Sequence, residues 1–255
     1  MRTELLRESI EDMPLIIDWD LRQQMAFVFE VPTREVEPTL PAGLQPFEAR
    51  PGVSLVFLGF NDYNPGNQIY GQAQPAFCEV TRFVMVHPDL AIDMPIPRFT
   101  FFVHRIGSNN ETFIRQEIEK LHLPSWHSPT LRVESSEDHL SAIARDRDGI
   151  VQTYHNTNPR VVWRDEEFYG QYYTVQDGQL WFGVWYWSGE AFIHQRRGEA
   201  GGSEEHPFLT ESQPRWPAAS ARRPYMQVIS KFDAPAVQIF FQPRCLGPVA
   251  HNGGK

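Results

Sequence analysis

The chain has 255 residues, of which 41% are hydrophobic and 22% charged, and its formal net charge is −9 at pH 7. This acidic balance argues against a nucleic-acid partner, because nucleic-acid-binding proteins usually carry a basic patch. The sequence has no apolar run of the roughly 18 residues that a membrane helix needs, and no signal-peptide pattern at its start.

These features favour a cytoplasmic protein with a single domain over residues 1–255 and enough apolar side chain for a sizeable core. Two cysteines are too few for a disulfide framework, and no cysteine–histidine cluster indicates zinc. The chain also lacks the glycine-rich loops that bind phosphates or dinucleotides. We therefore expect no metal and no cofactor.

In chain order, residues 1–17 suggest a short amphipathic helical segment. The β-rich runs at residues 25–31, 53–60, 77–86 and 98–106 predict strands. A turn-rich segment, NDYNPGNQIYGQAQP, separates the second run from the third and contains Tyr70. A loop of that length between buried strands is more often functional than structural.

A helix is predicted over residues 111–121, because Phe113, Ile114, Glu117, Ile118 and Leu121 recur at helical spacing. Pro124 ends it and turns the chain into a strand at residues 130–134.

From residue 130 onward the pattern is one of short strands with turns between them. The expected strands are residues 150–153, 160–163, 167–175, 179–187, 191–195, 226–230 and 237–242. Asp177-Gly178 is a hairpin signal between two of them. Residues 197–224 read as a long surface loop, rich in Gly, Ser, Glu, Pro and Arg.

The helix, proline turn and strand resemble the site segment of the acetoacetate decarboxylase superfamily. The run LPAGLQP at residues 40–46 resembles that family's opening turn, and the family's arginine and glutamate fall on Arg22 and Glu79. The family keeps two lysines after the proline, the first of which forms a Schiff base with a β-keto acid. Here Ser125 and Trp126 follow Pro124, so the resemblance implies a divergent member without the Schiff-base lysine.

The resemblance also implies the fold class. We expect an α+β, mainly β, acetoacetate decarboxylase-like closed or double-sheet barrel with a few short peripheral helices. Family members commonly assemble through their sheets, so a homo-oligomer is the expected assembly.

His122 and His127 flank the proline turn. Their spacing does not suit a metal site, and the resemblance favours a polar pocket group or a general acid/base. A simple exposed histidine is the alternative. Glu79 likewise either enters a cavity or faces solvent beside an arginine.

Trp181, Gly183, Trp185 and Trp187 share one face of a predicted strand. Three tryptophans around a glycine either line a ligand pocket or fill the core, where large aromatic side chains bury the most area.

Two functions from different classes follow. The first is a lyase-like enzyme acting on a small or aromatic carbonyl or keto-acid compound by non-imine acid/base chemistry, as in secondary metabolism. Its expected catalytic residues are Glu79, Arg22, His122 and His127, and its expected substrate-binding residues are Ser125, Trp126, Tyr70 and Trp185. The second is a non-catalytic small-molecule binding protein on the same scaffold.

Overall fold

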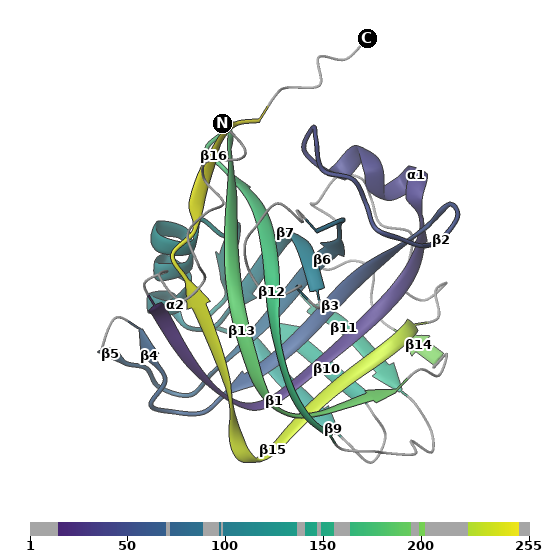
Figure 1. The fold of residues 1–255 in the computed structure, drawn as a ribbon. Coiled ribbons are helices and arrows are strands. Elements are labelled where there is room, and N and C mark those ends of the chain that lie inside the picture. Colours follow the sequence, from purple (N-terminus) through teal and green to yellow (C-terminus); the bar gives the residue numbers. More distant parts are fainter. Residues whose placement is uncertain are drawn as a thin grey trace.

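The computed structural model describes residues 15–69, 72–88, 97, 99–136, 141–146, 149–155, 164–194, 199–201 and 224–249. This part of the chain is mainly β, with two short α-helices that lie at opposite edges of the view in Figure 1. None of the helices described is long and apolar enough to cross a membrane.

The first half contains most of the strands that position the site. Its elements are β1 (Leu15–Pro32), α1 (Thr33–Val36), a 3₁₀ turn (Glu37–Thr39), β2 (Glu48–Arg50), β3 (Val53–Tyr63), β4 (Gln68–Ile69), β5 (Gln72–Ala73), β6 (Phe77–Met85), β7 (Phe99–Ser108), α2 (Glu111–Gln116), a π-helical turn (Glu117–Leu121) and β8 (Ser125–His127).

The second half is β structure throughout the residues described. Its strands are β9 (Arg132–Ser136), β10 (Ser141–Asp146), β11 (Gly149–His155), β12 (Arg164–Gln176), β13 (Gln179–His194), β14 (Glu199–Gly201), β15 (Pro224–Phe241) and β16 (Arg244–Pro248). Asp177 and Gly178 join β12 to β13 with φ values of 51° and 72°, as expected for a tight hairpin turn.

Twelve of these strands form one large mixed sheet in the order β2-β3-β6-β7-β12-β13-β15-β1-β4-β5, with β16 on β13 and β8 on β7. Most neighbours are antiparallel, but β7 pairs with β12 and β8 in parallel. Strand β1 hydrogen-bonds with β15 and also with β3, so the first and last long strands lie side by side (Figure 1).

The predicted mainly β class with short helices is confirmed. Because β1 pairs with both β15 and β3, the strands β1, β3, β6, β7, β12, β13 and β15 form a closed ring of hydrogen-bonded neighbours. Strands β2, β4, β5, β8 and β16 branch from or extend the large sheet, while β9, β10, β11 and β14 pair only among themselves in the described residues. The outcome is a large mixed sheet beside a separate four-stranded sheet.

Several predicted strands are longer in the structure. Residues 179–187 and 191–194 of two predicted strands join into β13, and residues 226–230 and 237–241 of two others join into β15. Of the helical segment expected at residues 1–17, residues 15–17 begin β1 and the others lie outside the described residues. Of the loop expected at 197–224, residues 199–201 form β14 and residue 224 begins β15, while residues 202–223 are not described. The strand expected at 160–163 is also outside the described residues.

The pleat of β3 and β6 divides the core in two. Even-numbered residues such as Leu58 and Val80 pack in one cluster, which also includes Val36 of α1. Odd-numbered residues such as Tyr63 and Phe77 pack on the opposite face with Trp187 of β13. We call this second set the site-side core, because α2 packs against it and the candidate site lies on the same face.

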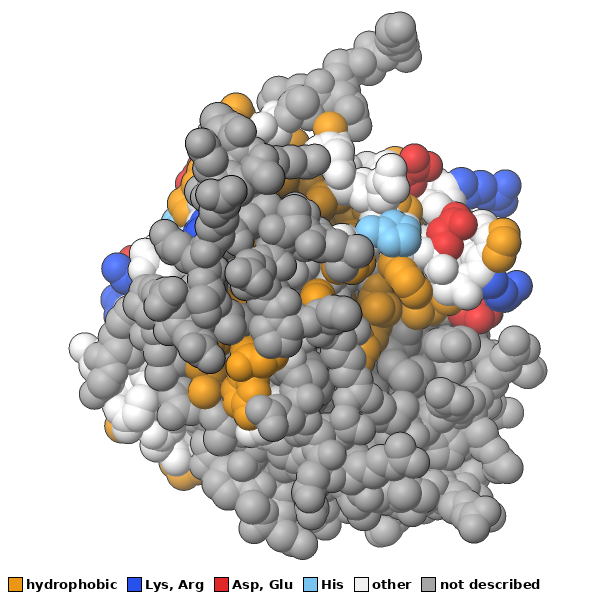
Figure 2. Space-filling view, in the orientation of Figure 1, with side chains coloured by type: hydrophobic (Ala, Val, Ile, Leu, Met, Phe, Trp, Pro, Cys, Tyr) orange, Lys and Arg blue, Asp and Glu red, His pale blue; other side chains and the backbone are white. Residues whose placement is uncertain are grey.

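On the face drawn in Figure 2, charged side chains of both signs gather around α1 and β2. There Arg50 donates a hydrogen bond to Glu30 at 2.8 Å. This part of the surface is therefore mixed in charge rather than a basic patch.

Candidate functional site

Glu79 lies in the site-side core, on the same face of β6 as Phe77, and only 5% of its surface is exposed. Both of its oxygens accept hydrogen bonds from β3, which runs beside β6. Tyr63 Oη donates to Oε2 at 2.7 Å and Asn61 Nδ2 donates to Oε1 at 3.1 Å. Of the two alternatives expected for Glu79, the one in which it faces solvent beside an arginine is therefore wrong.

A second buried carboxyl, Glu117, comes from the helix that follows β7. Asn110 caps the start of α2 by accepting a hydrogen bond from the Phe113 backbone N–H at 3.0 Å. Phe113 and Leu121 pack into the site-side core, so the same face of the helix buries Glu117, which is 2% exposed. A π-helical turn begins at this residue, and such turns are frequent at functional sites.

The proline turn positions Ser125, which is the hydrogen-bond partner of Glu117. His122 adopts a left-handed conformation with φ of 54° and ends the helix, and the backbone N–H of Leu123 donates to the carbonyl of Glu117. The chain then turns through Pro124 into β8. Ser125 at the start of β8 donates from Oγ to Glu117 Oε2 at 2.7 Å.

Burial dominates the electrostatics of this cluster, because a low-dielectric interior disfavours charged carboxylates. It raises the pKa of Glu79 to about 7, although the hydrogen bonds from Tyr63 and Asn61 oppose the shift. Burial, and then the charge of Glu79, raise the pKa of Glu117 well above its ordinary value. Burial and the Glu79 charge also raise the pKa of Tyr63. The two carboxyls therefore titrate as an interacting pair.

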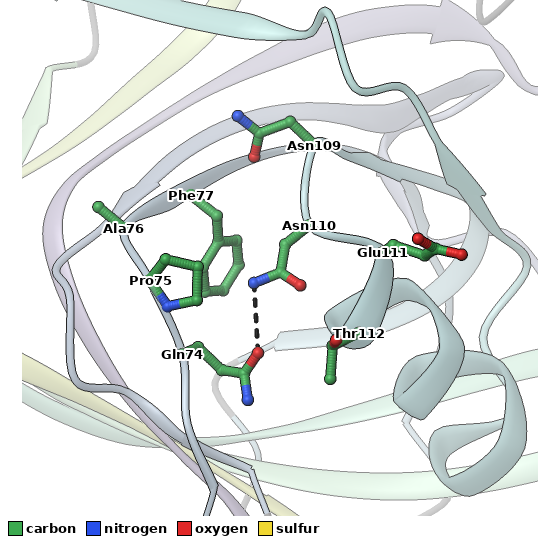
Figure 3. Close-up of a pocket in the computed structure, with 8 residues that line it drawn as sticks. All are labelled: Gln74, Pro75, Ala76, Phe77, Asn109, Asn110, Glu111 and Thr112. Atoms are coloured by element: carbon green, nitrogen blue, oxygen red, sulfur yellow. Dashed lines mark hydrogen bonds between the residues drawn. The ribbon is translucent and has the colours of Figure 1, made fainter.

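Three aromatic rings connect this cluster to the surface. Phe77 stacks on Tyr63 with ring centroids 4.3 Å apart and contacts Phe113 at 4.8 Å. Phe77 also lines a pocket of about 260 Å³ at the start of α2, shown in Figure 3. The pocket is lined by Gln74, Pro75, Ala76, Phe77, Asn109, Asn110, Glu111 and Thr112.

The side-chain amides of this pocket already hold its walls together. Asn110 donates to Gln74 at 3.4 Å, the dashed contact of Figure 3. Asn109 accepts from the Cys78 backbone N–H and donates to the Leu131 carbonyl. The pocket therefore has a fixed polar wall, and the ring of Phe77 links it to the Tyr63–Glu79 hydrogen bond.

Arg22 is not brought to Glu79. Its side chain is 59% exposed and forms an ion pair with Asp62. Asp62 lies between Asn61 and Tyr63 on β3, so the pleat directs it to the face opposite the one that carries Glu79. The register of β1 against β3 also shifts between Leu21 and Gln23, at the position of Arg22. The expected anchoring arginine thus belongs to a surface ion pair in this structure.

The two histidines of the proline turn differ in position. His122 stacks on Trp181 with ring centroids 3.3 Å apart, and its Nδ1 lies 2.9 Å from Gln176 Oε1. Partial burial lowers its pKa, an effect that Gln176 opposes. His127 lies in the same row as Glu79, because it pairs with Ser108 of β7 and Ser108 pairs with Glu79. Two strand spacings separate their Cα atoms by about 10 Å.

The expected substrate-binding residues are also divided between faces. Ser125 lies at the cluster, whereas Trp126 points to the opposite face, where Arg105 lies 5.8 Å from its ring. Trp185 is half-buried against the site-side core. Tyr70 lies outside the described residues.

The face of β13 that carries the tryptophans packs against other side chains of the protein. Trp187 is 1% exposed in the site-side core. A Cβ at Gly183 would overlap the ring of Tyr172 from β12, so the space beside the glycine is occupied by that ring. This arrangement favours the packing interpretation for Trp187 and Gly183.

Comparison with known proteins finds similarity in structure only. No protein-family model matches the sequence, and no curated protein matches it. A solved acetoacetate decarboxylase aligns with a TM-score of 0.61 at 11% identity, covering 92% of this chain and 91% of the other. The acetoacetate decarboxylase of Legionella pneumophila aligns with a TM-score of 0.61 at 10% identity, covering 92% and 89%. The chain has an acetoacetate decarboxylase-like fold.

A biosynthetic enzyme shares this fold. The enduracididine biosynthesis enzyme MppR, solved with the condensation product of pyruvate and imidazole 4-carboxaldehyde, aligns with a TM-score of 0.54 at 9% identity and covers 92% and 90% of the two chains. The acetoacetate decarboxylase-like fold is thus compatible with more than one reaction.

On this acetoacetate decarboxylase-like scaffold, sequence reasoning missed Glu117, Asn61 and Tyr63. Glu117 had a visible signal, since it falls on the apolar stripe of the helix with Phe113 and Leu121. Asn61 and Tyr63 alternate with Asp62 at the end of a buried strand, but only the register of β3 against β6 shows that they meet Glu79.

The arrangement can store and transfer protons. It contains two carboxyls with raised pKa values, hydroxyl groups from Tyr63 and Ser125, and a surrounding apolar core. Among the described residues, no group of three or more His, Cys, Asp or Glu side chains is arranged to hold a metal ion.

Proposed function

We propose that this chain is a lyase-like enzyme that acts on a small or aromatic carbonyl or keto-acid compound by acid/base chemistry without an imine. The reaction is a decarboxylation, dehydration, isomerisation or cyclisation, in a biosynthetic setting such as secondary metabolism. One observation carries the proposal: Glu79 is buried, hydrogen-bonded by Tyr63 and Asn61, and has its pKa raised to about 7. A carboxyl with that pKa accepts and donates protons efficiently near neutral pH.

The absence of imine chemistry is supported by the residue that follows Pro124. An imine-forming lysine must be neutral, which requires burial or a neighbouring cation. The position where the resemblance places the first family lysine is Ser125, and its hydroxyl binds Glu117. Lys120, on the same helix, is exposed and therefore lacks the burial by which an imine-forming lysine is kept neutral.

Borohydride trapping tests the imine question directly. Incubation with pyruvate or acetoacetate and borohydride, followed by intact mass analysis, should give no covalent adduct. The chain has only three lysines, Lys120, Lys231 and Lys255, so peptide mapping would assign any adduct. A stable adduct on one of them would show that an imine forms and would contradict the mechanism.

Turnover tests the role of Glu79. A panel of keto acids and ketones is screened with the unmodified protein, and the best substrate is then given to Glu79→Gln. We expect turnover to fall on the order of 10²- to 10⁴-fold, the usual contribution of a general acid or base. Exposed Glu119→Gln is the matched control on the helix. Ligand binding without turnover in either protein would instead indicate a non-catalytic binding protein.

A further inference from the structure

The hydrogen bonds at the two buried carboxyls are unequal. Glu79 accepts one donor on each oxygen, from Asn61 and from Tyr63. Glu117 accepts the Ser125 hydroxyl on Oε2. Donors on both oxygens stabilise a carboxylate, whereas a carboxylic acid needs one oxygen to carry its proton.

Two negative charges are not stable together in this core. Glu79 is 5% exposed and Glu117 is 2% exposed, and the charge on Glu79 disfavours ionisation of Glu117. The titratable group that faces both is Tyr63, which is neutral because burial and Glu79 raise its pKa. A pair of this kind retains one proton when the solvent is near neutral pH.

We infer that Glu117 holds this proton and is the acid that works with the base Glu79, so that the substrate is a carbonyl compound with a C–H bond next to its carbonyl and the reaction passes through an enol. This inference rests on the proposed function of Glu79. Among the reactions named in the proposed function, the acid/base pair favours isomerisation or another reaction that begins with enolisation.

The enolisation step balances without a further reactant. The α-carbon gives its proton to the Glu79 carboxylate, and the electron pair of that C–H bond forms the C=C bond. The carbonyl π electrons move to oxygen, which takes the proton of Glu117. The pair keeps one proton, now on Glu79. Return of this proton to carbon and of the enol O–H proton to Glu117 restores the starting state.

Ser125 is the positioning residue for Glu117. Its backbone N–H donates to the Leu123 carbonyl at 2.8 Å, and β8 pairs with β7, so the hydroxyl is held on a fixed segment. Its hydrogen bond to Oε2 leaves Oε1 to carry the acidic proton.

Hydrogen exchange tests the acid and base together. Pyruvate and phenylpyruvate are incubated with the protein in D₂O, and proton NMR follows loss of the C3 hydrogens. The unmodified protein should accelerate exchange over buffer. Glu79→Gln and Glu117→Gln should each reduce that acceleration on the order of 10²-fold or more. Exposed Glu119→Gln should match the unmodified protein. Absence of acceleration with both keto acids, or unmodified exchange in Glu117→Gln, would overturn the inference.

Infrared spectroscopy locates the proton independently of any reaction. At about pH 8, where Glu79 with its pKa of about 7 is mostly ionised, the protein should show the carbonyl band of a buried carboxylic acid, and this band should shift in D₂O. Glu117→Gln should remove most of the band and Glu79→Gln should retain it, whereas Ser125→Ala should change its frequency. Loss of the band in Glu79→Gln with retention in Glu117→Gln would place the proton on Glu79 and contradict the inference.

Failure of the proposed function can be distinguished from failure of the assignment of Glu117 as the acid. Unchanged turnover in Glu79→Gln removes the proposed function, whereas Glu79-dependent turnover with a fully active Glu117→Gln removes only the acid assigned here. Circular dichroism checks that Glu117→Gln folds, as expected because the amide is neutral and similar in shape. Should that variant fail to fold, Ser125→Ala provides the exchange test, with an expected loss on the order of 10-fold from a misplaced acid.

Discussion

At the scale of single residues, Glu79 and Glu117 link the site to the stability of the protein. Burial raises the pKa of each carboxyl in the folded state above the usual value of about 4.5 for glutamate, and the pKa of Glu79 is about 7. Between these pH values the folded chain binds more protons than the unfolded chain. Its free energy of unfolding must therefore fall as pH rises through this window.

Urea unfolding from pH 4 to pH 8 measures this effect. The unmodified protein should lose stability as pH rises from about 4.5 to about 7, and Glu79→Gln should flatten the profile by on the order of 1 kcal/mol or more. Glu119→Gln, with an exposed side chain, should keep the original slope. Parallel profiles for Glu79→Gln and the unmodified protein would contradict the raised pKa.

At the scale of elements, the β12–β13 hairpin depends on a glycine facing a large ring. Gly183 pairs with Tyr172, and a Cβ at this glycine would overlap the Tyr172 ring. Gly183→Ala should lower the free energy of unfolding by about 1–3 kcal/mol, the usual cost of overpacking a core. Denaturant unfolding checks this, and introducing the same change into Tyr172→Leu should cost less because the ring is gone. Equal costs in both backgrounds would show that the ring is not the cause.

The elements also show how far the sequence could be read. Runs of β-favouring residues located β3, β6 and β7, and helical spacing located the helix to Leu121, because both patterns reflect burial. Periodicity along one strand does not report its register against the next, and register decides that Asn61 meets Glu79 while Arg22 pairs with Asp62. Glu117 was on the predicted stripe, but a carboxylate there is normally taken as a boundary of the apolar face.

At the scale of the whole molecule, the sheet joins the two ends of the described chain. Strand β15 lies between β1 and β13, so the first long strand depends on one of the last. A chain that ends at residue 223 lacks β15 and β16 and leaves edges of β1 and β13 without their partners. We expect it to show no cooperative unfolding transition by circular dichroism, whereas a chain that ends at residue 249 should retain one. A cooperative transition in the shorter chain would contradict this dependence.

The hydrogen bond from Ser125 to Glu117 also determines what a lysine at position 125 would do. Replacing Ser125 by lysine would set an amine beside a buried carboxyl. The two would form an ammonium–carboxylate pair, and the proton held there would block attack of the amine on a carbonyl. A lysine at this position would therefore not supply the neutral amine that an imine requires unless Glu117 changed as well.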